Sequence, residues 1–307
     1  MSDSKMKAIQ FKDYGGPEKL ELVEVPRPTI GPNEVLIRMK AAGVNPADWK
    51  IREGYMKAWA PTPWVAGLDG AGVVAEVGAE VKDLRKGDAV FGPIVNSYAE
   101  YAKCQAAELT KLPKGLSFDG AATFPVGALT AWKSVEDAGV QVGQTVLVQG
   151  AAGGVGLFAA QLAKLKGAKV IGTASKDNLA FVRSLGVDQV IDYRAQRVGE
   201  TLHDVDVVLD TVGGEAVNEL WPVLKRGGVM VTIAAQLSEE LAKKHGVRAV
   251  HSGRASATHL KAIADLYASG KIKTEIQTTF PLAQARAAQE LCQTGHGRGR
   301  IVLHIED

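Results

Sequence analysis

The segment Gly150-Ala151-Ala152-Gly153-Gly154-Val155-Gly156 decides the fold because of what stands on either side of it. The apolar run Thr145–Gln149 precedes it and has the length of a buried strand. A tight turn after that strand needs glycine, and backbone N–H groups at the start of a following helix can bind a pyrophosphate. Gly153 and Gly154 would let phosphates approach closely, and Gly156 would let the helix pack on the strand. Apolar residues recur on one face of the expected helix at Val155, Phe158, Ala159, Leu162 and Leu165.

Further short apolar runs alternate with helical stretches after this segment, which is typical of a parallel sheet with crossover helices. The strands that we expect are Lys169–Thr173, Gln189–Asp192, Val205–Asp210 and Val229–Ile233. The fold class is therefore α/β, and this part of the chain is expected to form a doubly wound, nucleotide-binding parallel sheet.

The first part of the chain differs, because its short β-like runs are separated by Gly and Pro rather than by helices. The expected strands are Lys7–Phe11, Glu21–Val25, Glu34–Ala41, Gly72–Val77 and Ala89–Phe91. This pattern predicts a compact, barrel-like β domain. The C-terminal segment Lys271–Ile305 returns to strand-like runs, and we expect it to rejoin that domain.

Composition and charge argue against several classes of protein. The 307 residues are 46% hydrophobic and 23% charged, and the net charge of +2 does not favour nucleic acid or an acidic membrane surface as partner. Two cysteines, Cys104 and Cys292, cannot build a disulfide framework or a four-thiolate zinc site. No apolar leader or membrane-length apolar run is evident, so the expected location is cytoplasmic.

The end of the second expected strand indicates which nicotinamide cofactor is bound. An NAD enzyme usually carries an acid there, about 20 residues beyond the glycines, which binds the ribose hydroxyls. Ser175 and Lys176 stand in that place and can bind a 2′-phosphate, while Asp177 is interpreted as the N-cap of the next helix. Tyr193 and Arg194 could flank the same phosphate. NADPH is favoured, and the alternative is that Lys176 and Arg194 are solvated surface charges.

Six motifs spread over much of the chain are more specific together than any one alone. They are Ala41-Ala42-Gly43-Val44-Asn45-Pro46-Ala47-Asp48, Gly67-Leu68-Asp69-Gly70-Ala71-Gly72, Gly87-Asp88-Ala89-Val90-Phe91-Gly92, Leu129-Thr130-Ala131-Trp132, the turn Gly150 to Gly156, and Asp210-Thr211-Val212-Gly213-Gly214. With these motifs the chain resembles the medium-chain dehydrogenase/reductase superfamily, and specifically its zinc-free quinone oxidoreductase and enone reductase branch.

This resemblance implies two domains. Residues 1–126 and 268–307 would form a GroES-like, partly open β-barrel substrate domain around an inserted Rossmann NADP-binding domain of residues 127–267. The active site would lie in the cleft between them.

The chain departs from the zinc-dependent members of the superfamily at the metal ligands. Those members carry a cysteine where this chain has Asn45 and a His-Glu pair where it has Leu68-Asp69, and their four-cysteine structural lobe is missing here. A catalytic zinc needs about three protein ligands. We therefore expect no metal.

Without a metal, the hydride acceptor must already be electrophilic. Quinones and α,β-unsaturated carbonyls fit, because hydride addition gives a hydroquinone anion or an enolate that hydrogen bonds can stabilise. The resemblance makes Asn45 and Tyr55 the catalytic candidates. Asn45 can donate to the nicotinamide carboxamide or a substrate carbonyl, or else cap the turn before Pro46. Tyr55 can hydrogen-bond a developing oxyanion, or else be a packed loop aromatic.

The remaining site predictions concern the cofactor. Arg300 stands where the family often has a lysine before the last strand, and its contact is left open; the stretch Ala235–Arg254 matches no family motif. The residues expected to bind the cofactor are Asn45, Thr130, Gly150, Ala152, Gly153, Gly154, Val155, Thr173, Ser175, Lys176, Tyr193, Val212, Ile233, Ala234 and Arg300.

Two alternative functions remain beside NADPH-dependent reduction of quinones or activated C=C bonds. One is a zinc-free alcohol, sugar or carbonyl dehydrogenase, and the other is a non-catalytic, crystallin-like NADPH-binding protein. A homodimer is expected, because Val229–Ile233 would be an apolar edge strand whose unpaired backbone groups favour pairing across a two-fold axis.

Overall fold

The computed structural model describes residues 4–253 and 255–306, and its contacts divide the chain into two compact units. Unit 1 combines the N-terminal part up to Val126 with Ala257–Ala268 and the segment from Glu275 onward. Unit 2 consists of Gly127–Ser256 and Ser269–Thr274. The sequence-based division puts helix α8 (Thr258–Ala268) in the Rossmann domain, whereas these contacts group it with unit 1.

Unit 2 contains a six-stranded parallel sheet with the order β11-β10-β9-β12-β13-β14. The bounds are β9 (Thr145–Gln149), β10 (Lys169–Ala174), β11 (Gln189–Asp192), β12 (Val205–Asp210), β13 (Leu224–Thr232) and β14 (Arg248–His251). The strand order reverses between β9 and β12, so the backbone just after these two strands lies where doubly wound folds bind their ligands. The predicted doubly wound parallel sheet is confirmed.

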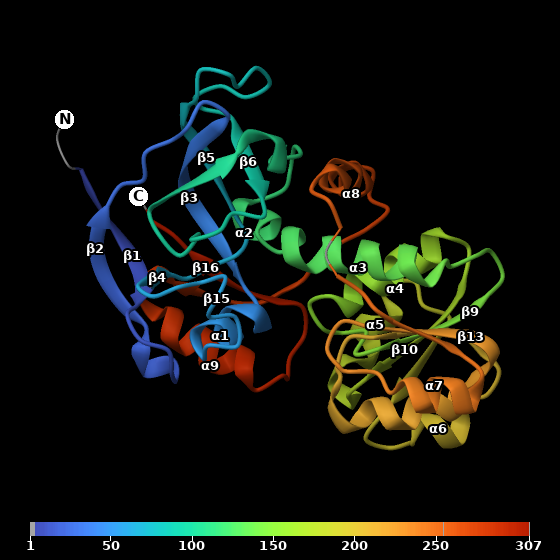
Figure 1. The fold of residues 1–307 in the computed structure, drawn as a ribbon. Coiled ribbons are helices and arrows are strands. Elements are labelled where there is room, and N and C mark those ends of the chain that lie inside the picture. The colour runs from blue at the N-terminus through green and yellow to red at the C-terminus, as the bar shows by residue number, and fades with distance from the viewer. Residues whose placement is uncertain (1–3, 254, 307) are drawn as a thin grey trace. The chain divides into compact units, whose positions relative to one another are not determined.

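Helices cover both faces of this sheet. In Figure 1, α3 (Phe124–Ala138) and α4 (Gly156–Leu165) lie on one side, and α6 (Val198–Thr201) and α7 (Glu239–His245) lie on the other. Helix α5 (Leu179–Arg183) packs against β11. Because both faces are covered, β9 and β12 are apolar throughout their centres and read in the sequence as short continuous runs.

The prediction that Val229–Ile233 is the edge strand is wrong, because β14 pairs in parallel with β13 from Val229↔Arg248 to Thr232↔His251. Strand β14 is only four residues long and is exposed at both ends, so it gives no apolar run. It comes from the stretch that matched no family motif, whose last residue, Arg254, lies outside the described residues. Strand β13 is apolar because it is an internal strand.

Unit 1 is mainly β-structure arranged around one long strand, β3 (Glu34–Val44). On one side β3 pairs with β5 (Gly70–Val77), and on the other its first half pairs with β7 (Tyr101–Gln105) and its end with β16 (Arg300–His304). The sheet continues through β15 (Ile276–Pro281), β6 (Ala89–Gly92) and β8 (Thr110–Lys111). A second sheet has the order β2-β1-β4, with β1 (Lys5–Phe11), β2 (Glu21–Pro26) and β4 (Trp64–Val65).

Three helices of unit 1 pack beside these sheets. Helix α1 (Pro46–Arg52) follows β3 directly and contacts α9 (Ala285–Gln293), while α2 (Phe118–Ala121) lies against β3 and β5. The buried side chain of Arg52 in α1 donates through Nε to Gln289 of α9 at 2.9 Å. No helix among the described residues combines the length and apolar character that a bilayer crossing requires.

A buried polar cluster joins α1, β3 and β16 in unit 1. Arg300 Nη2 donates to Asn45 Oδ1 at 2.6 Å and to Asp69 Oδ2 at 3.2 Å, and Asn45 Nδ2 donates to Asp69 Oδ1 at 3.0 Å. These three residues are between 0% and 4% exposed. Buried charges are tolerated when they are paired and hydrogen-bonded, and the two charges here pair with each other. Arg300 Nε is also buried and has no hydrogen-bond partner among the described residues.

Asp48 forms the second part of the cluster. Its Oδ2 accepts from the backbone N–H of Asn45 at 2.8 Å and from the Tyr98 hydroxyl at 2.9 Å. Desolvation by burial, together with the neighbouring Asp69 carboxylate, raises the pKa of Asp48 to about 7. The folded chain therefore keeps a proton on Asp48 at pH values where the unfolded chain has lost it.

The replacement Asp48→Asn tests this cluster through stability. In the native protein the free energy of unfolding should fall as the pH rises from about 4 to about 7, because the unfolded chain releases the Asp48 proton first. The variant should lack this part of the slope and be more stable at pH 8, by on the order of 2 kcal/mol. Urea unfolding followed by fluorescence between pH 5 and pH 8.5 measures the difference.

Asp83→Asn, at an exposed position, is the matched control. Parallel pH profiles for the native protein and Asp48→Asn would show that Asp48 is not protonated in the folded state. The amide has the size of the carboxyl, and its oxygen can accept the hydrogen bonds that Asp48 Oδ2 accepts from Asn45 N and the Tyr98 hydroxyl.

Candidate functional site

The turn after β9 is closed by backbone contacts that only glycine permits. Gly150 has φ = 76°, and a Cβ on Gly156 would lie 2.1 Å from the Gly150 oxygen. The end of β10 holds the turn from the other side, because Gly150 N donates to Thr173 Oγ1 at 3.0 Å and Ala151 N donates to Thr173 O at 2.9 Å. Thr173 is 2% exposed and thus shapes the turn through its own hydroxyl.

The rest of the predicted phosphate-binding turn leads into the N-terminus of α4. Ala152 is buried, whereas Gly153, Gly154 and Val155 are half-buried. A Cβ on Gly153 would meet only the Gly150 oxygen, at 3.3 Å, so the backbone is open at this position. Helix α4 starts at Gly156 and is 10 residues long, so its positive end points at the turn.

The turn after β12 lies next to this one in the sheet, because Asp210 pairs with Gln149. Asp210 is 1% exposed, and its Oδ1 accepts from Val212 N at 3.0 Å and from Gly213 N at 2.9 Å. Its Oδ2 accepts from the hydroxyl of Thr232 in β13 at 2.6 Å. The carboxylate therefore fixes the backbone at the carboxyl ends of β12 and β13.

A second close backbone approach completes this edge. Gly213 has φ = 74°, and a Cβ there would lie 2.7 Å from the Ala234 oxygen. Val212 and Ala234 are exposed and Ile233 is half-buried, so the structure brings these predicted cofactor residues together with the Gly150 turn. A Cβ on Gly150 would meet Val212 Cγ2 at 2.7 Å.

The residues predicted to select the cofactor lie at the ends of β10 and β11. Ser175 accepts through Oγ from Asn178 Nδ2 at 3.1 Å, and Lys176 is exposed. Tyr193 is 46% exposed, and the Arg194 guanidinium lies 5.8 Å from its ring centroid. Ala174 and Asp192 pair in neighbouring strands, so the two segments end at the same edge.

The interpretation of Asp177 as a helix N-cap is wrong. Ser175 precedes the 3₁₀ turn Lys176–Asn178, and Asn178 is the N-cap of α5. Asp177 is an exposed residue inside that turn. The interpretation failed because one short 3₁₀ turn separates β10 from the helix.

These residues fit a bound dinucleotide. Glycines keep the backbone free of side chains at two turns that adjoin the strand-order reversal, and a helix N-terminus points at the first turn. Thr130, which was also predicted to bind the cofactor, is half-buried within α3 and lies outside the two turns. A nicotinamide dinucleotide bound here would be held largely by backbone groups.

Asn45 and Arg300 are placed in unit 1, inside the buried polar cluster. Asn45 is 0% exposed, and its side-chain amide contacts Gly43, Asp69 and Arg300. Arg300 is 4% exposed. Their role as direct cofactor contacts stays a prediction, while the recorded contacts give both residues a positioning role at the start of α1.

Tyr55 differs sharply from Asn45 in its surroundings. It lies beyond the C-terminal end of α1 and is 74% exposed, whereas Asn45 caps the N-terminal end of the same helix. Seven helical residues separate them, which is about 10 Å along the axis. The structure therefore places the two catalytic candidates at opposite ends of α1.

The residues at the metal positions of zinc-dependent relatives do not fit a catalytic zinc. The Arg300 guanidinium already occupies the oxygens of Asn45 and Asp69, and Leu68 offers no ligand atom. Within residues 4–253 and 255–306, no group of three His, Cys, Asp or Glu side chains is arranged to hold a metal ion. A metal ion would have to compete with a fixed positive charge at this point.

The sequence did not predict the buried hydrogen bonds that Asp69, Tyr98 and Thr232 make. Asp69 appeared only as a departure from a metal-ligand pattern. Tyr98 was not among the predicted site residues, yet it is 0% exposed and donates its hydroxyl to Asp48. A polar residue in an otherwise apolar run, as Thr232 is in Val229–Ile233, was the available signal.

Two family models match the chain. Residues 31–136 match the alcohol dehydrogenase GroES-like domain, and residues 185–303 match the zinc-binding dehydrogenase domain.

Individual relatives match over almost the whole chain. A 2-methylene-furan-3-one reductase of Solanum lycopersicum is 36% identical over 98% of this chain and 79% of its own length. An NADPH-dependent alkenal/one oxidoreductase of Arabidopsis thaliana, a chloroplastic protein, is 35% identical over 97% of this chain and 79% of its own length.

The solved structure of the quinone oxidoreductase from Coxiella burnetii superposes with a TM-score of 0.91 at 36% identity, covering 99% of this chain and 100% of that chain. By sequence and by fold, the chain belongs to the medium-chain dehydrogenase/reductase superfamily, in the branch that includes quinone oxidoreductases and alkenal/enone reductases.

Proposed function

We propose that the protein is an NADPH-dependent reductase that delivers hydride to a quinone or to the C=C bond of an α,β-unsaturated carbonyl, without zinc. The observation that carries the proposal is the pair of glycine turns at the strand-order reversal of unit 2, in a chain related to reductases of such acceptors. The reduced nicotinamide, when bound, supplies the hydride.

The proposed role of Tyr55 follows from its exposure and chemistry. Hydride addition at the β-carbon of an enone moves negative charge onto the carbonyl oxygen. The Tyr55 phenol is 74% exposed, can donate a hydrogen bond to that oxygen, and can exchange its proton with solvent. Because the enolate is delocalised, one hydrogen-bond donor is enough to stabilise its oxygen. Solvent or Tyr55 then returns a proton to the α-carbon.

Zinc independence is supported by the cluster around Arg300. An unactivated ketone would need a Lewis acid to stabilise its alkoxide, whereas an enone or quinone does not. The guanidinium that fills the space between Asn45 and Asp69 stabilises the protein and does not polarise a substrate, because it is buried. An acceptor that is already electrophilic is therefore the better fit.

The preference for NADPH rests on Ser175 and Lys176 at the end of β10. Lys176 is exposed and begins the turn after Ser175, so its ammonium can reach a 2′-phosphate there. Tyr193 and Arg194, at the end of the adjacent strand β11, supply a ring face and a second cation. The next acid along the chain, Asp177, lies inside the 3₁₀ turn rather than at the strand end.

A homodimer remains part of the proposal, with a different basis from the one that the sequence suggested. The last strand on that side of the sheet is β14, whose outer backbone groups have no strand beside them within the described part of the chain. Two copies could pair across a two-fold axis through β14, which would remove the unpaired edge.

The cofactor assignment predicts the effect of Lys176→Ala. Loss of one charge-assisted hydrogen bond should weaken NADPH binding by about 1–3 kcal/mol, roughly 5- to 100-fold, and leave NADH binding almost unchanged. Fluorescence titration of both cofactors measures this. Lys166→Ala removes an exposed lysine at the end of α4 and is the control. Equal use of NADH and NADPH by the native protein would contradict the assignment.

Product analysis tests the reaction itself. With a simple enone, deuterated NADPH and excess chelator, the expected product is a saturated ketone with deuterium at the β-carbon. The chelator should not change the rate, since no metal takes part. An allylic alcohol labelled at the carbinol carbon would show carbonyl reduction, and loss of activity together with one zinc per chain would contradict the metal-free reaction.

In the same assay, Tyr55→Phe should slow the reaction about tenfold, or ~1.4 kcal/mol, and leave the position of the label unchanged.

The proposed dimer is tested by light scattering. At micromolar concentration the native protein should have twice the monomer mass. Ser252 N donates to Thr232 O in β13, and N–H groups alternate in direction along a strand, so Ala249 N–H faces the outer edge of β14. Ala249→Pro should therefore give a monomer, because proline removes this outer donor. A monomer mass for the native protein would contradict the dimer. A dimeric Ala249→Pro variant would show that the contact lies elsewhere.

A further inference from the structure

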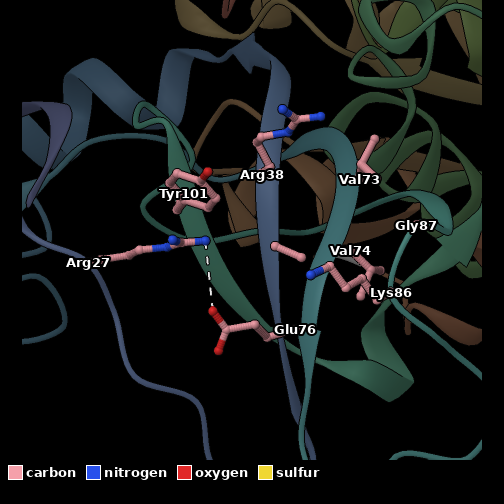
Figure 2. A pocket seen from close by; sticks show the side chains of 9 residues that line it. Arg27, Arg38, Val73, Val74, Glu76, Lys86, Gly87 and Tyr101 are labelled. Carbon is pink, nitrogen blue, oxygen red and sulfur yellow. Dashed lines mark ion pairs between the residues drawn. The ribbon is translucent and has the colours of Figure 1, made fainter. Parts of the chain in front are cut away.

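A pocket of about 440 Å³ lies on unit 1, and none of its lining residues belongs to the predicted cofactor or substrate site. Figure 2 shows it over β3 and β5, with side chains converging from the segment after β2, from β7 and from the loop before β6. Three of its side chains are cations, Arg27, Arg38 and Lys86, and one is an anion, Glu76. The lining therefore has an excess of positive charge.

The register of the sheet explains how these residues meet. Arg38 in β3 lies directly opposite Tyr101 in β7 and opposite Val73 in β5, so the three side chains stand on one face. The neighbours Ile37 and Met39 face the core and are at most 1% exposed. The pocket is thus built on the outer face of the same strands that hold the core of unit 1.

Arg27 is the most constrained cation in the pocket. Its guanidinium lies 3.6 Å from the centroid of the Tyr101 ring, and its Nη2 is 3.9 Å from Glu76 Oε1, beyond hydrogen-bond distance. Its Nε is buried and has no hydrogen-bond partner among the described residues. The Tyr101 ring therefore orients the Arg27 guanidinium, and most of the N–H donors of this guanidinium remain unused.

The other cations approach from different directions. In Figure 2, Lys86 extends into the pocket from the side opposite Arg27, and Arg38 stands at a third side. Glu76, the single carboxylate, is 59% exposed at its side chain and is free to turn toward solvent. Cations that surround a common space repel one another, and a bound anion would relieve that repulsion.

We propose that this pocket binds a phosphate group, either free or carried by a small molecule. A planar guanidinium with unused donors matches two oxygens of a phosphate, and the lysine and second arginine add charge from other sides. The volume is in the range of small-molecule pockets and exceeds what a bare phosphate ion needs. The apolar side chains of Val73 and Ala75, which alternate with the buried Val74, can contact the organic part of a phosphate ester.

The test follows the Arg27 Nε–Hε signal in heteronuclear NMR during titration with inorganic phosphate at constant ionic strength. The readout is local, so phosphate bound at the nucleotide turns does not count. We expect a saturable shift that Lys86→Ala weakens about fivefold or more, because a charge in the pocket is lost. Glu76→Gln should tighten binding severalfold, because a competing carboxylate is removed.

Lys82→Ala is the matched control, since Lys82 is an exposed lysine of the same segment that does not line the pocket. Its effect should stay within about twofold. The proposal is overturned by the absence of a saturable shift, or by equal effects of Lys86→Ala and Lys82→Ala, which would indicate general screening.

A second titration with ribose 5-phosphate distinguishes the two sources of the phosphate group. Tighter binding than that of inorganic phosphate supports a site for phosphate esters that contact Val73 and Ala75. Equal binding supports a site that recognises the ion alone.

Discussion

The buried ion pair between Arg300 and Asp69 is the interaction on which unit 1 depends. It joins the last strand of the chain to a turn 231 positions earlier, and Asn45 completes it by bonding to both partners. Removing any one of the three groups would leave a buried charge or amide unpaired, which costs several kcal/mol. Strand β16 is therefore an essential part of this domain, even though it is synthesised after the whole of unit 2.

The nucleotide-binding sheet of unit 2 depends on a different constraint, the close approach of backbone to backbone. Gly156 lies against the Gly150 oxygen and Gly213 against the Ala234 oxygen, so neither position accepts a side chain. Asp210 and Thr173 hold these turns through hydrogen bonds to backbone N–H groups. Thr173 was predicted as a cofactor contact, and its hydroxyl shapes the backbone of the turn.

Apolar runs bounded by turn residues were enough to predict several strands of unit 2. The strands β9, β11 and β12 begin and end as predicted, because each is a short apolar run bounded by turn residues. Strand β14 was missed because only its two middle residues are apolar, and its ends, Arg248 and His251, are polar and exposed. The contact of Asn45 with Arg300 joins residues 255 apart in sequence and carries no local signal, so only the folded arrangement shows that both are engaged in one cluster.

The same cluster also engages the hydroxyl of Tyr98, which sets this tyrosine apart from others in unit 1. Tyr98 donates its hydroxyl to Asp48, and burial with the nearby Asp48 carboxylate raises its pKa well above the usual range, so it holds its proton. Tyr14 donates its hydroxyl to the Ala60 carbonyl at 2.8 Å. Tyr55 lies on the loop beyond α1 and is 74% exposed. The buried cluster therefore engages Tyr98, whereas Tyr55 is exposed beyond the end of the helix, and the proposed function makes Tyr55 the donor to a substrate oxygen.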